Sequence, residues 1–228
     1  MKKLIALMLA AVLCLSIAAC GSNSGTTLPK VTEPATVEDL YAELVNYATT
    51  GQYLEAWRLT TKNPEVLEYE DAQDYSDYCD AMKAYENGGI GYAYKHLQGV
   101  SHILNAQDTL DIIEAKIGGL NGHYVADNGV GSYLHIVIQD GMVAREVIGY
   151  HDEEQEFVPT EDDFFYNLVV SKYDDGTEYL AIGRYSSLGA DLNADYVIHT
   201  FDDTTDLMLI NLATNEYNTF NGVYTKIS

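Results

Sequence analysis

Basic residues are scarce in this chain. Twelve Lys and Arg residues stand against 35 Asp and Glu residues among 228, which gives a formal net charge of −23 at neutral pH. Binding to nucleic acid or to an anionic membrane surface needs clustered Lys and Arg side chains that neutralise phosphates. We therefore expect neither kind of surface to be a partner of this protein.

Cysteine is rare as well, with only Cys14, Cys20 and Cys79 in the chain. The first two belong to an unusual N-terminal region, which leaves Cys79 alone in the body of the protein. A single thiol can build neither a disulfide framework nor a thiolate metal site. Because Cys79 sits among helix-forming residues, we expect it to be a small core residue rather than a reactive thiol.

Sequence signatures of catalysis are missing. The chain has no Gly-x-Ser-x-Gly elbow, no His-Glu-x-x-His helix and no phosphate loop. The glycine-rich stretch NGVGS at 128–132 lacks a following Lys and is interpreted as a loop between strands. We expect no enzymatic activity. The weakest alternative is a carboxylate-based hydrolase, which the acidic pairs would permit; these are Glu153-Glu154, Asp162-Asp163 and Asp202-Asp203.

The N-terminus differs in composition from the rest of the chain. Lys2 and Lys3 precede an apolar run from Leu4 to Leu15, and small residues then lead to Cys20. A basic start, a short apolar core and small residues before a cleavage point describe a secretory signal that is too short to span a membrane. We expect residues 1–19 to be removed, which leaves enough chain for one large domain or two small ones.

The tetrapeptide Ile17-Ala18-Ala19-Cys20 resembles the lipobox of bacterial lipoproteins. This resemblance implies that Cys20 is the lipidated first residue of the mature chain; ordinary cleavage after Ala19 is the alternative. The lipid would anchor the protein to the extracytoplasmic face of the bacterial cell membrane, its only membrane contact. Residues 20–35 are small, polar and interrupted by proline, and they are predicted to form a flexible tether.

Residues 36–118 show helical periodicity. Thr36 is the expected N-cap of the first helix, with Asp39 three positions later. Apolar residues then recur every three or four positions between interrupting glycines, which predicts about five helices. Their apolar stripes begin at Val37, Tyr53, Tyr75, Ile90 and Leu110.

This helical region is similar to itself at a fixed distance. The stretch GQYLEAW at 51–57 corresponds to GGIGYAY at 88–94, and the triplet AQD at 72–74 recurs at 106–108. Small residues at equivalent places let paired helices approach closely, and stacked pairs bury what one pair leaves exposed. The pattern resembles degenerate tetratricopeptide-like repeats, and an unrelated helical bundle is the alternative. If residues 51–57 are a repeat core, Ala56 and Trp57 are predicted to pack between the helices; the alternative is that Trp57 is an exposed anchor for a binding partner.

The periodicity changes from helical to alternating near Gly118-Gly119, which we take as the boundary of a second domain, residues 119–228. Three stretches rich in β-formers, 133–150, 166–185 and 196–210, have the form of hairpins, the first two turning at Asp-Gly pairs. With single strands before and after them, about eight antiparallel strands are predicted. The fold class is therefore α+β, with a helical region followed by a β-barrel or a sandwich.

The barrel is favoured by one weak resemblance. The stretches LNGHY at 120–124 and NGVY at 221–224, which open and close the β half, resemble the glycine-x-aromatic strands of bacterial lipocalin-like or calycin-like barrels. Two functions then remain open. One is a lipoprotein that binds a protein or small ligand as an interaction module; the other is a lipocalin-like carrier of a small apolar ligand, which needs a hollow barrel.

Two patterns suggest metal ligands. Asp191, Asn193, Asp195 and Asp202 have the spacing of oxygen ligands in a loop, which resembles the calcium loops of EF-hand-like and dockerin modules. Tyr196 stands where such a loop needs glycine, so a solvated turn is the favoured interpretation and no cofactor is expected. Histidines 123, 135 and 199 lie in or near predicted strands and could hold a zinc ion, although nothing in their spacing requires it.

Overall fold

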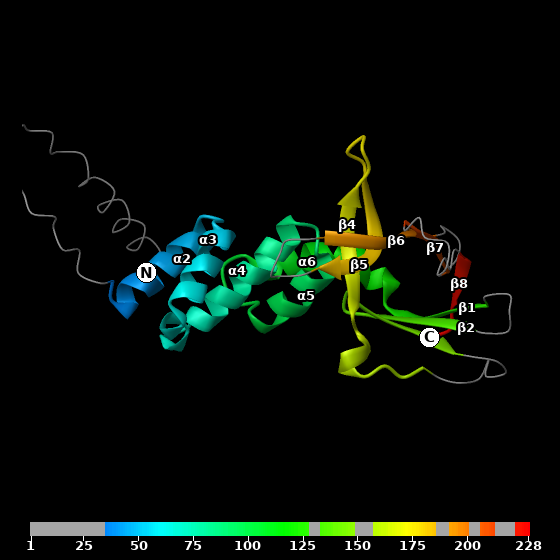
Figure 1. Cartoon of the computed structure of the whole chain (residues 1–228), viewed down its shortest axis with the longest axis horizontal. Helices are drawn as coiled ribbons and strands as arrows, with labels where there is room; N and C mark the ends of the chain where they lie inside the picture. The colour runs from blue at the N-terminus through cyan, green and yellow to red at the C-terminus, as the bar shows by residue number, and fades with distance from the viewer. Residues whose placement is uncertain (1–34, 128–132, 149–156, 186–191, 201–205, 213–221) are drawn as a thin grey trace, which may run out of the picture. The chain divides into compact units, whose positions relative to one another are not determined.

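The computed structural model describes residues 35–127, 133–148, 157–185, 192–200, 206–212 and 222–228. These residues form five helices followed by a closed eight-stranded antiparallel β-barrel, which confirms the α+β class and favours the barrel over the sandwich (Figure 1). Cys20, the predicted signal peptide and nearly all of the tether lie outside the described residues. No helix in the described part of the chain has the length and apolar character needed to cross a bilayer.

The helices lie where the apolar stripes predicted them. Thr36 caps the first one through a capping box, since its side chain accepts a hydrogen bond from the Asp39 amide while the Asp39 carboxylate accepts one from the Thr36 amide. Short 3₁₀ turns, η1 (Pro64–Glu68) and η2 (Gly118–Leu120), interrupt and end the helical region. The helices are α2 (Val37–Thr49), α3 (Tyr53–Lys62), α4 (Ala72–Glu86), α5 (Ile90–Gly99) and α6 (Ala106–Ile117).

The self-similarity of the sequence has a geometric counterpart. Gly51 before α3 and Gly88 before α5 both have a positive φ, 73° and 85°. Ala56 and Ala93, five residues further on in each case, are both buried, at 1% and 0% exposure. A glycine with positive φ ends one helix, and a small residue in the next helix then allows the two helices to pack closely.

The entries into α4 and α6 match in the same way. The residues just before these entries, Glu70 and Leu104, have φ values of 46° and 44°, although neither is glycine. In both AQD triplets the glutamine amide donates to an aspartate four residues later at 2.8 Å, from Gln73 and from Gln107. The hairpin of α3 and α4 and the hairpin of α5 and α6 therefore repeat one local geometry.

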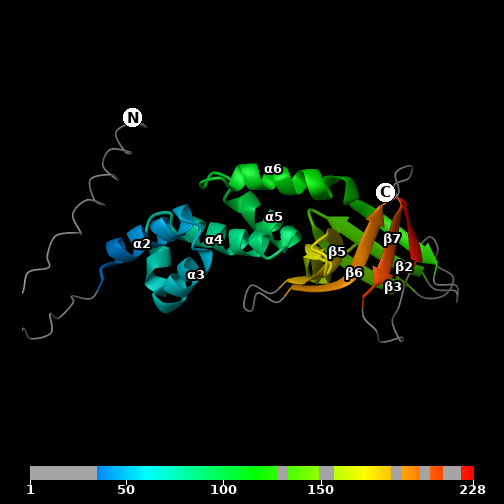
Figure 2. The same cartoon turned by 90° about the horizontal axis from the view of Figure 1, so that it is seen from above.

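The barrel is an up-and-down meander in which each strand pairs with the next and β8 closes on β1 (Figure 2). Asp140 and Gly141 form the predicted tight turn, with φ values of 51° and 77°. The strands are β1 (Gly122–Asp127), β2 (Tyr133–Gln139), β3 (Met142–Ile148), β4 (Tyr166–Lys172), β5 (Glu178–Tyr185), β6 (Leu192–Thr200), β7 (Leu207–Asn211) and β8 (Gly222–Lys226), with a 3₁₀ turn η3 (Glu161–Asp163) between β3 and β4.

The interior of the barrel is filled by its own side chains. The cavity that remains among them has a volume of about 10 Å³, which is room for about one water molecule. Aromatic and branched side chains line it, and they include Leu134, Ile136, Tyr166, Ile182, Tyr196 and Tyr224.

Helices and barrel share one continuous apolar core. The junction is made by backbone groups: the Gly88 carbonyl accepts a hydrogen bond from the Val170 amide of β4 at 2.7 Å. Gly91 on α5 meets Gly141 of the β2–β3 turn so closely that neither position has room for a side chain. The predicted boundary near Gly118 matches the change from helix to strand, and the independence of the two parts as folding units stays a prediction.

Candidate functional site

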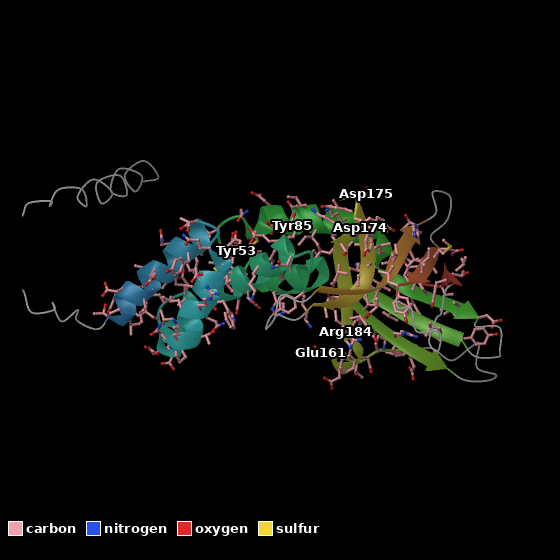
Figure 3. The ribbon with its side chains drawn as sticks, turned by 45° about the horizontal axis from the view of Figure 1, so that its top comes forward. Tyr53, Tyr85, Glu161, Asp174, Asp175 and Arg184 are labelled. Carbon is pink, nitrogen blue, oxygen red and sulfur yellow. The ribbon has the colours of Figure 1, made fainter. Side chains whose placement is uncertain are left out.

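An open groove of about 430 Å³ lies where the helical region meets the β4–β5 hairpin. Its volume is within the range of about 300–1,000 Å³ that is usual for ligand sites. Figure 3 labels Tyr85 at the end of α4 and Asp174 and Asp175 at the tip of the hairpin. We call it the β4 groove; its lining is Tyr85, Glu86, Asn87, Gly88, Ile90, Lys116, Val170, Ser171, Lys172 and Glu178.

The floor of the β4 groove is the edge of strand β4. Strand β5 pairs with β4 from Asn167 to Lys172, whereas β3 pairs only with its first two residues. Beyond them, the Gly141 carbonyl accepts from the Leu168 amide and the Gly88 carbonyl from the Val170 amide, both at 2.7 Å. Alternate residues of a strand direct their amides to the same side, so the Lys172 amide faces the groove.

The charged side chains of the groove come from four different elements. Lys116 of α6 and Lys172 of β4 bring positive charge into a strongly acidic protein. Lys172 Nζ lies 3.5 Å from Glu178 Oε1, but both side chains are more than half exposed, so the pair contributes little to stability. Burial raises the pKa of Glu86 above its ordinary value.

The remaining walls are an aromatic ring and a positioned amide. Tyr85 is half-buried and packs against the shared core, which holds its ring in place. The side-chain amide of Asn87 donates to the Lys83 carbonyl at 2.8 Å, and this bond orients the turn between α4 and α5. The groove thus combines a ring, ammonium groups, carboxylates and a strand edge. This combination suits recognition of a polar, extended ligand.

A second groove, of about 310 Å³, borders the opposite end of α5. Glu161, which lines it, lies on the other side of the barrel from Asp174 and Asp175 of the β4–β5 hairpin tip in Figure 3. We call it the α5 groove; its lining is Lys95, Gln98, Gln139, Asp140, Met142, Pro159, Glu161 and Phe164.

The structure brings two of the three predicted histidines together. His123 Nε2 and His135 Nδ1 lie 2.8 Å apart on β1 and β2, and both residues are buried. His199 is exposed on β6. Over the described ranges, no group of three or more His, Cys, Asp and Glu residues is arranged to hold a metal ion. The pairing depends on strand register, which the spacing of the histidines did not reveal.

The predicted calcium loop is only partly described. Asp191 and Asp202 lie outside the described residues, while Asn193 and Asp195 lie in the extended strand β6. Asp195 Oδ2 is 3.6 Å from Arg184 Nε on the neighbouring strand. An EF-hand-like loop must curl around its ion, and an extended strand provides no such curl at these two residues.

Sequence reasoning missed an arginine inside the barrel. Arg145 Nη1 donates a hydrogen bond to Tyr196 Oη at 2.8 Å, and its guanidinium carbon lies 5.4 Å from the centre of that ring. Burial raises the pKa of nearby Tyr224, and the positive charge of Arg145 offsets part of this rise. Inward alternation along β3 could have identified Arg145 once its strand was placed.

Comparison of the chain with protein-family models, with curated proteins and with solved structures finds no match. The tetratricopeptide-like and lipocalin-like resemblances therefore gain no support from relatives.

Proposed function

We propose that this protein is a lipid-anchored, extracytoplasmic binding protein without catalytic activity, and that the β4 groove receives an extended segment of a partner protein. The edge of β4 at Lys172 carries this proposal. It offers a backbone amide at the foot of a groove of about 430 Å³, next to Tyr85 and Lys116. Peptides that add to a sheet edge gain affinity from backbone hydrogen bonds and specificity from the side-chain pockets beside them.

The helical region supports the same function. Its two matched hairpins resemble tetratricopeptide-like units, which stack to present extended binding surfaces. In this interpretation the repeats orient the turn at Gly88, which forms one wall of the β4 groove. The lipid proposed at Cys20 and the predicted tether up to residue 35 would allow the groove to reach partners near the membrane surface.

The carrier function is the second candidate, and the filled barrel argues against it. A lipocalin-like site needs an enclosed volume of at least about 300 Å³, whereas this interior has about 10 Å³. A ligand would have to displace buried side chains such as Leu134 and Tyr224. We expect no saturable binding of a fluorescent fatty acid, and stoichiometric uptake would favour the carrier. The carboxylate-based hydrolase has no observation in its favour.

The groove is tested by removing one backbone donor. Peptides selected from a random library on the wild-type protein should perturb the amide resonances of Val170, Ser171 and Lys172. Lys172→Pro, which deletes the amide hydrogen, should weaken their binding at least about tenfold, the equivalent of a single lost hydrogen bond. Lys172→Ala keeps the amide and is the matched control. Equal affinity for the two variants, or perturbations confined to other surfaces, would contradict the proposal.

A further inference from the structure

A buried pair of imidazoles lies on the outer wall of the barrel. Side chains alternate along a strand, and Tyr124 and Leu134 pack in the core, so their neighbours His123 and His135 face outward. They are nevertheless only 8% and 1% exposed. With 2.8 Å between the two nitrogens, one ring must donate and the other accept, so at most one of the two can carry a positive charge.

Phe157 packs against this pair and begins a segment, residues 157–165, which we call the strap. The ring of Phe157 lies edge-on to both imidazoles, with centroids 6.4 Å from His123 and 6.5 Å from His135. Phe157 and Ala144 form a small buried cluster of their own, against which Val137 and Phe164 pack. The Nε2 atom of His135 is buried and has no hydrogen-bond partner among the described residues. A proton added to this nitrogen would create a buried positive charge that no water molecule solvates.

Among the described residues, the strap is held mainly by local hydrogen bonds and by two phenylalanine rings. Its hydrogen bonds among the described residues are local, and they include the capping box in which the Thr160 amide donates to the Asp163 carboxylate at 2.7 Å. Val158 and Phe165 are 73% and 74% exposed. A segment with local hydrogen bonds and few buried anchors opens at low cost. Phe157 and Phe164 are the anchors that the structure shows.

We propose that acid releases the strap and thereby opens the α5 groove. Protonation of the histidine pair would remove the uncharged surface on which the ring of Phe157 packs. Pro159, Glu161 and Phe164 of the strap form one wall of that groove. Once both imidazoles are charged they repel each other at contact distance and require water, which the strap excludes. Ligand access to the α5 groove would then differ between neutral and acidic surroundings.

Several charged or titratable groups of described residues neighbour the pair. On β3 the exposed Glu146 is the cross-strand partner of His135, and Tyr133 neighbours it on β2. Glu161 and Asp163 lie on the strap, and the Ser228 carbonyl accepts from the His123 amide. Burial and, to a smaller extent, the neighbouring His123 lower the pKa of His135.

Because the pKa of His135 is lowered when the strap is closed, acid destabilises the closed strap. With the strap closed, burial and, to a smaller extent, His123 hold the pKa of His135 below its ordinary value of about 6.5. Opening of the strap removes the burial, so the pKa rises toward that value, although His123 remains beside the ring. The closed state is therefore fully favoured above about pH 6.5 and loses stability as the pH falls below it. Between pH 7.5 and 5.0 we therefore expect the population of the open strap to rise, since the open state binds a proton that the closed state binds more weakly.

Hydrogen exchange of the full chain measures this opening. Protection factors, corrected for the pH dependence of intrinsic exchange, should fall between pH 7.5 and 5.0 in peptides covering 157–165, while β4 and β5 remain unchanged. His135→Leu, which fills the same site without titrating, should keep the strap protected at pH 5.0. Unchanged protection in the wild type, or the same loss in the leucine variant, would overturn the proposal.

Two further variants test the proposal even if His135→Leu does not fold. His199→Gln alters the exposed histidine of the same barrel and should leave the acid response intact. Phe157→Ala should lower the protection of the strap at both pH values and abolish the difference between them. If His135→Leu fails to fold, the pair Phe157→Ala and His199→Gln still decides the question. A full acid response in Phe157→Ala, or its loss in His199→Gln, would show that the histidine pair does not hold the strap.

Discussion

Gly91 on α5 and Gly141 in the β2–β3 turn touch backbone to backbone. A Cβ placed on Gly91 would lie 2.0 Å from the Gly141 carbonyl oxygen and 2.9 Å from the Leu168 amide nitrogen. A Cβ on Gly141 would in turn lie 2.6 Å from the Cα of Gly91. The contact between helix and barrel therefore depends on two residues that lack side chains, at positions 50 residues apart in the chain.

Gly91→Ala should weaken this contact severely. The new methyl group meets rigid backbone on both sides, so the helix and the barrel must separate, at a cost near the upper end of the roughly 1–3 kcal/mol that is typical of overpacking. Gly99→Ala, at the end of the same helix, is the matched control, because a Cβ added at Gly99 would contact no other group within 4 Å. It should be neutral or stabilise by up to about 1 kcal/mol. Urea unfolding of both variants checks the prediction, and similar midpoints would refute the close contact.

Two tyrosines of the helical region donate comparable hydrogen bonds to the residue that precedes a later helix. Tyr41 of α2 donates to the Asp71 carboxylate, and Tyr78 of α4 donates to the Asn105 side-chain oxygen. Tyr78 is 1% exposed whereas Tyr41 is only half-buried. Tyr78→Phe should therefore cost about 1–1.5 kcal/mol and Tyr41→Phe less, because the exposed site can bond to water instead. Thermal unfolding of the two variants measures the difference, and the reverse order would contradict the burial that the structure assigns.

Ala56 and Trp57 were both predicted to pack in the helical core, and their burial differs. Ala56 is 1% exposed, which confirms its prediction. Trp57 is half-buried, and the Nζ of buried Lys83 lies 5.1 Å from the centre of its ring. Ala56→Leu should overpack the helices by about 1–3 kcal/mol.

Trp57→Ala should cost less than the roughly 3–5 kcal/mol of a fully buried tryptophan, but more than about 1 kcal/mol, since Lys83 loses its aromatic partner. Trp57→Phe, which retains a ring, is the control for both effects. A melting temperature of Trp57→Ala within about 1 °C of the wild type would exclude a structural role for the ring.

Cys79 should be chemically inert in the folded protein. It is 1% exposed, and burial raises the pKa of its thiol to about 12. Because the thiolate is the reactive form, alkylation by iodoacetamide at pH 8 should be at least about a hundredfold slower in the native state than in denaturant. Peptide mass spectrometry after a timed pulse locates the label on Cys79. Comparable rates in the two states would mean that the helical core opens readily.

The lipid anchor is tested at Cys20. Cys20→Ala removes the thiol that would carry the lipid, so the protein should pass from the membrane fraction to the medium in a bacterial host. Cys14→Ala, inside the predicted signal, is the control and should leave membrane association unchanged. Retention of the Cys20 variant in the membrane fraction would exclude lipidation as the anchor.

Local patterns in the sequence were sufficient to place the secondary structure. The stripes starting at Val37 and Ile90 became helices because apolar residues at a spacing of three or four gather on one side of a helix. The Asp140-Gly141 pair became a tight turn because both residues tolerate a positive φ. Even the repeat was visible, since the glycines and alanines that let helices approach closely keep their positions.

Everything that depends on contacts between distant residues was decided by the tertiary structure. Strand register brought His123 beside His135 and left His199 exposed, and barrel closure turned Arg145 toward Tyr196. The filled interior and the grooves beside α5 arise from how side chains of many elements meet. Periodicity records the environment of each residue along its own element, but not which other element supplies that environment. The sequence alone therefore determined the elements and their order, and only packing decided the sites.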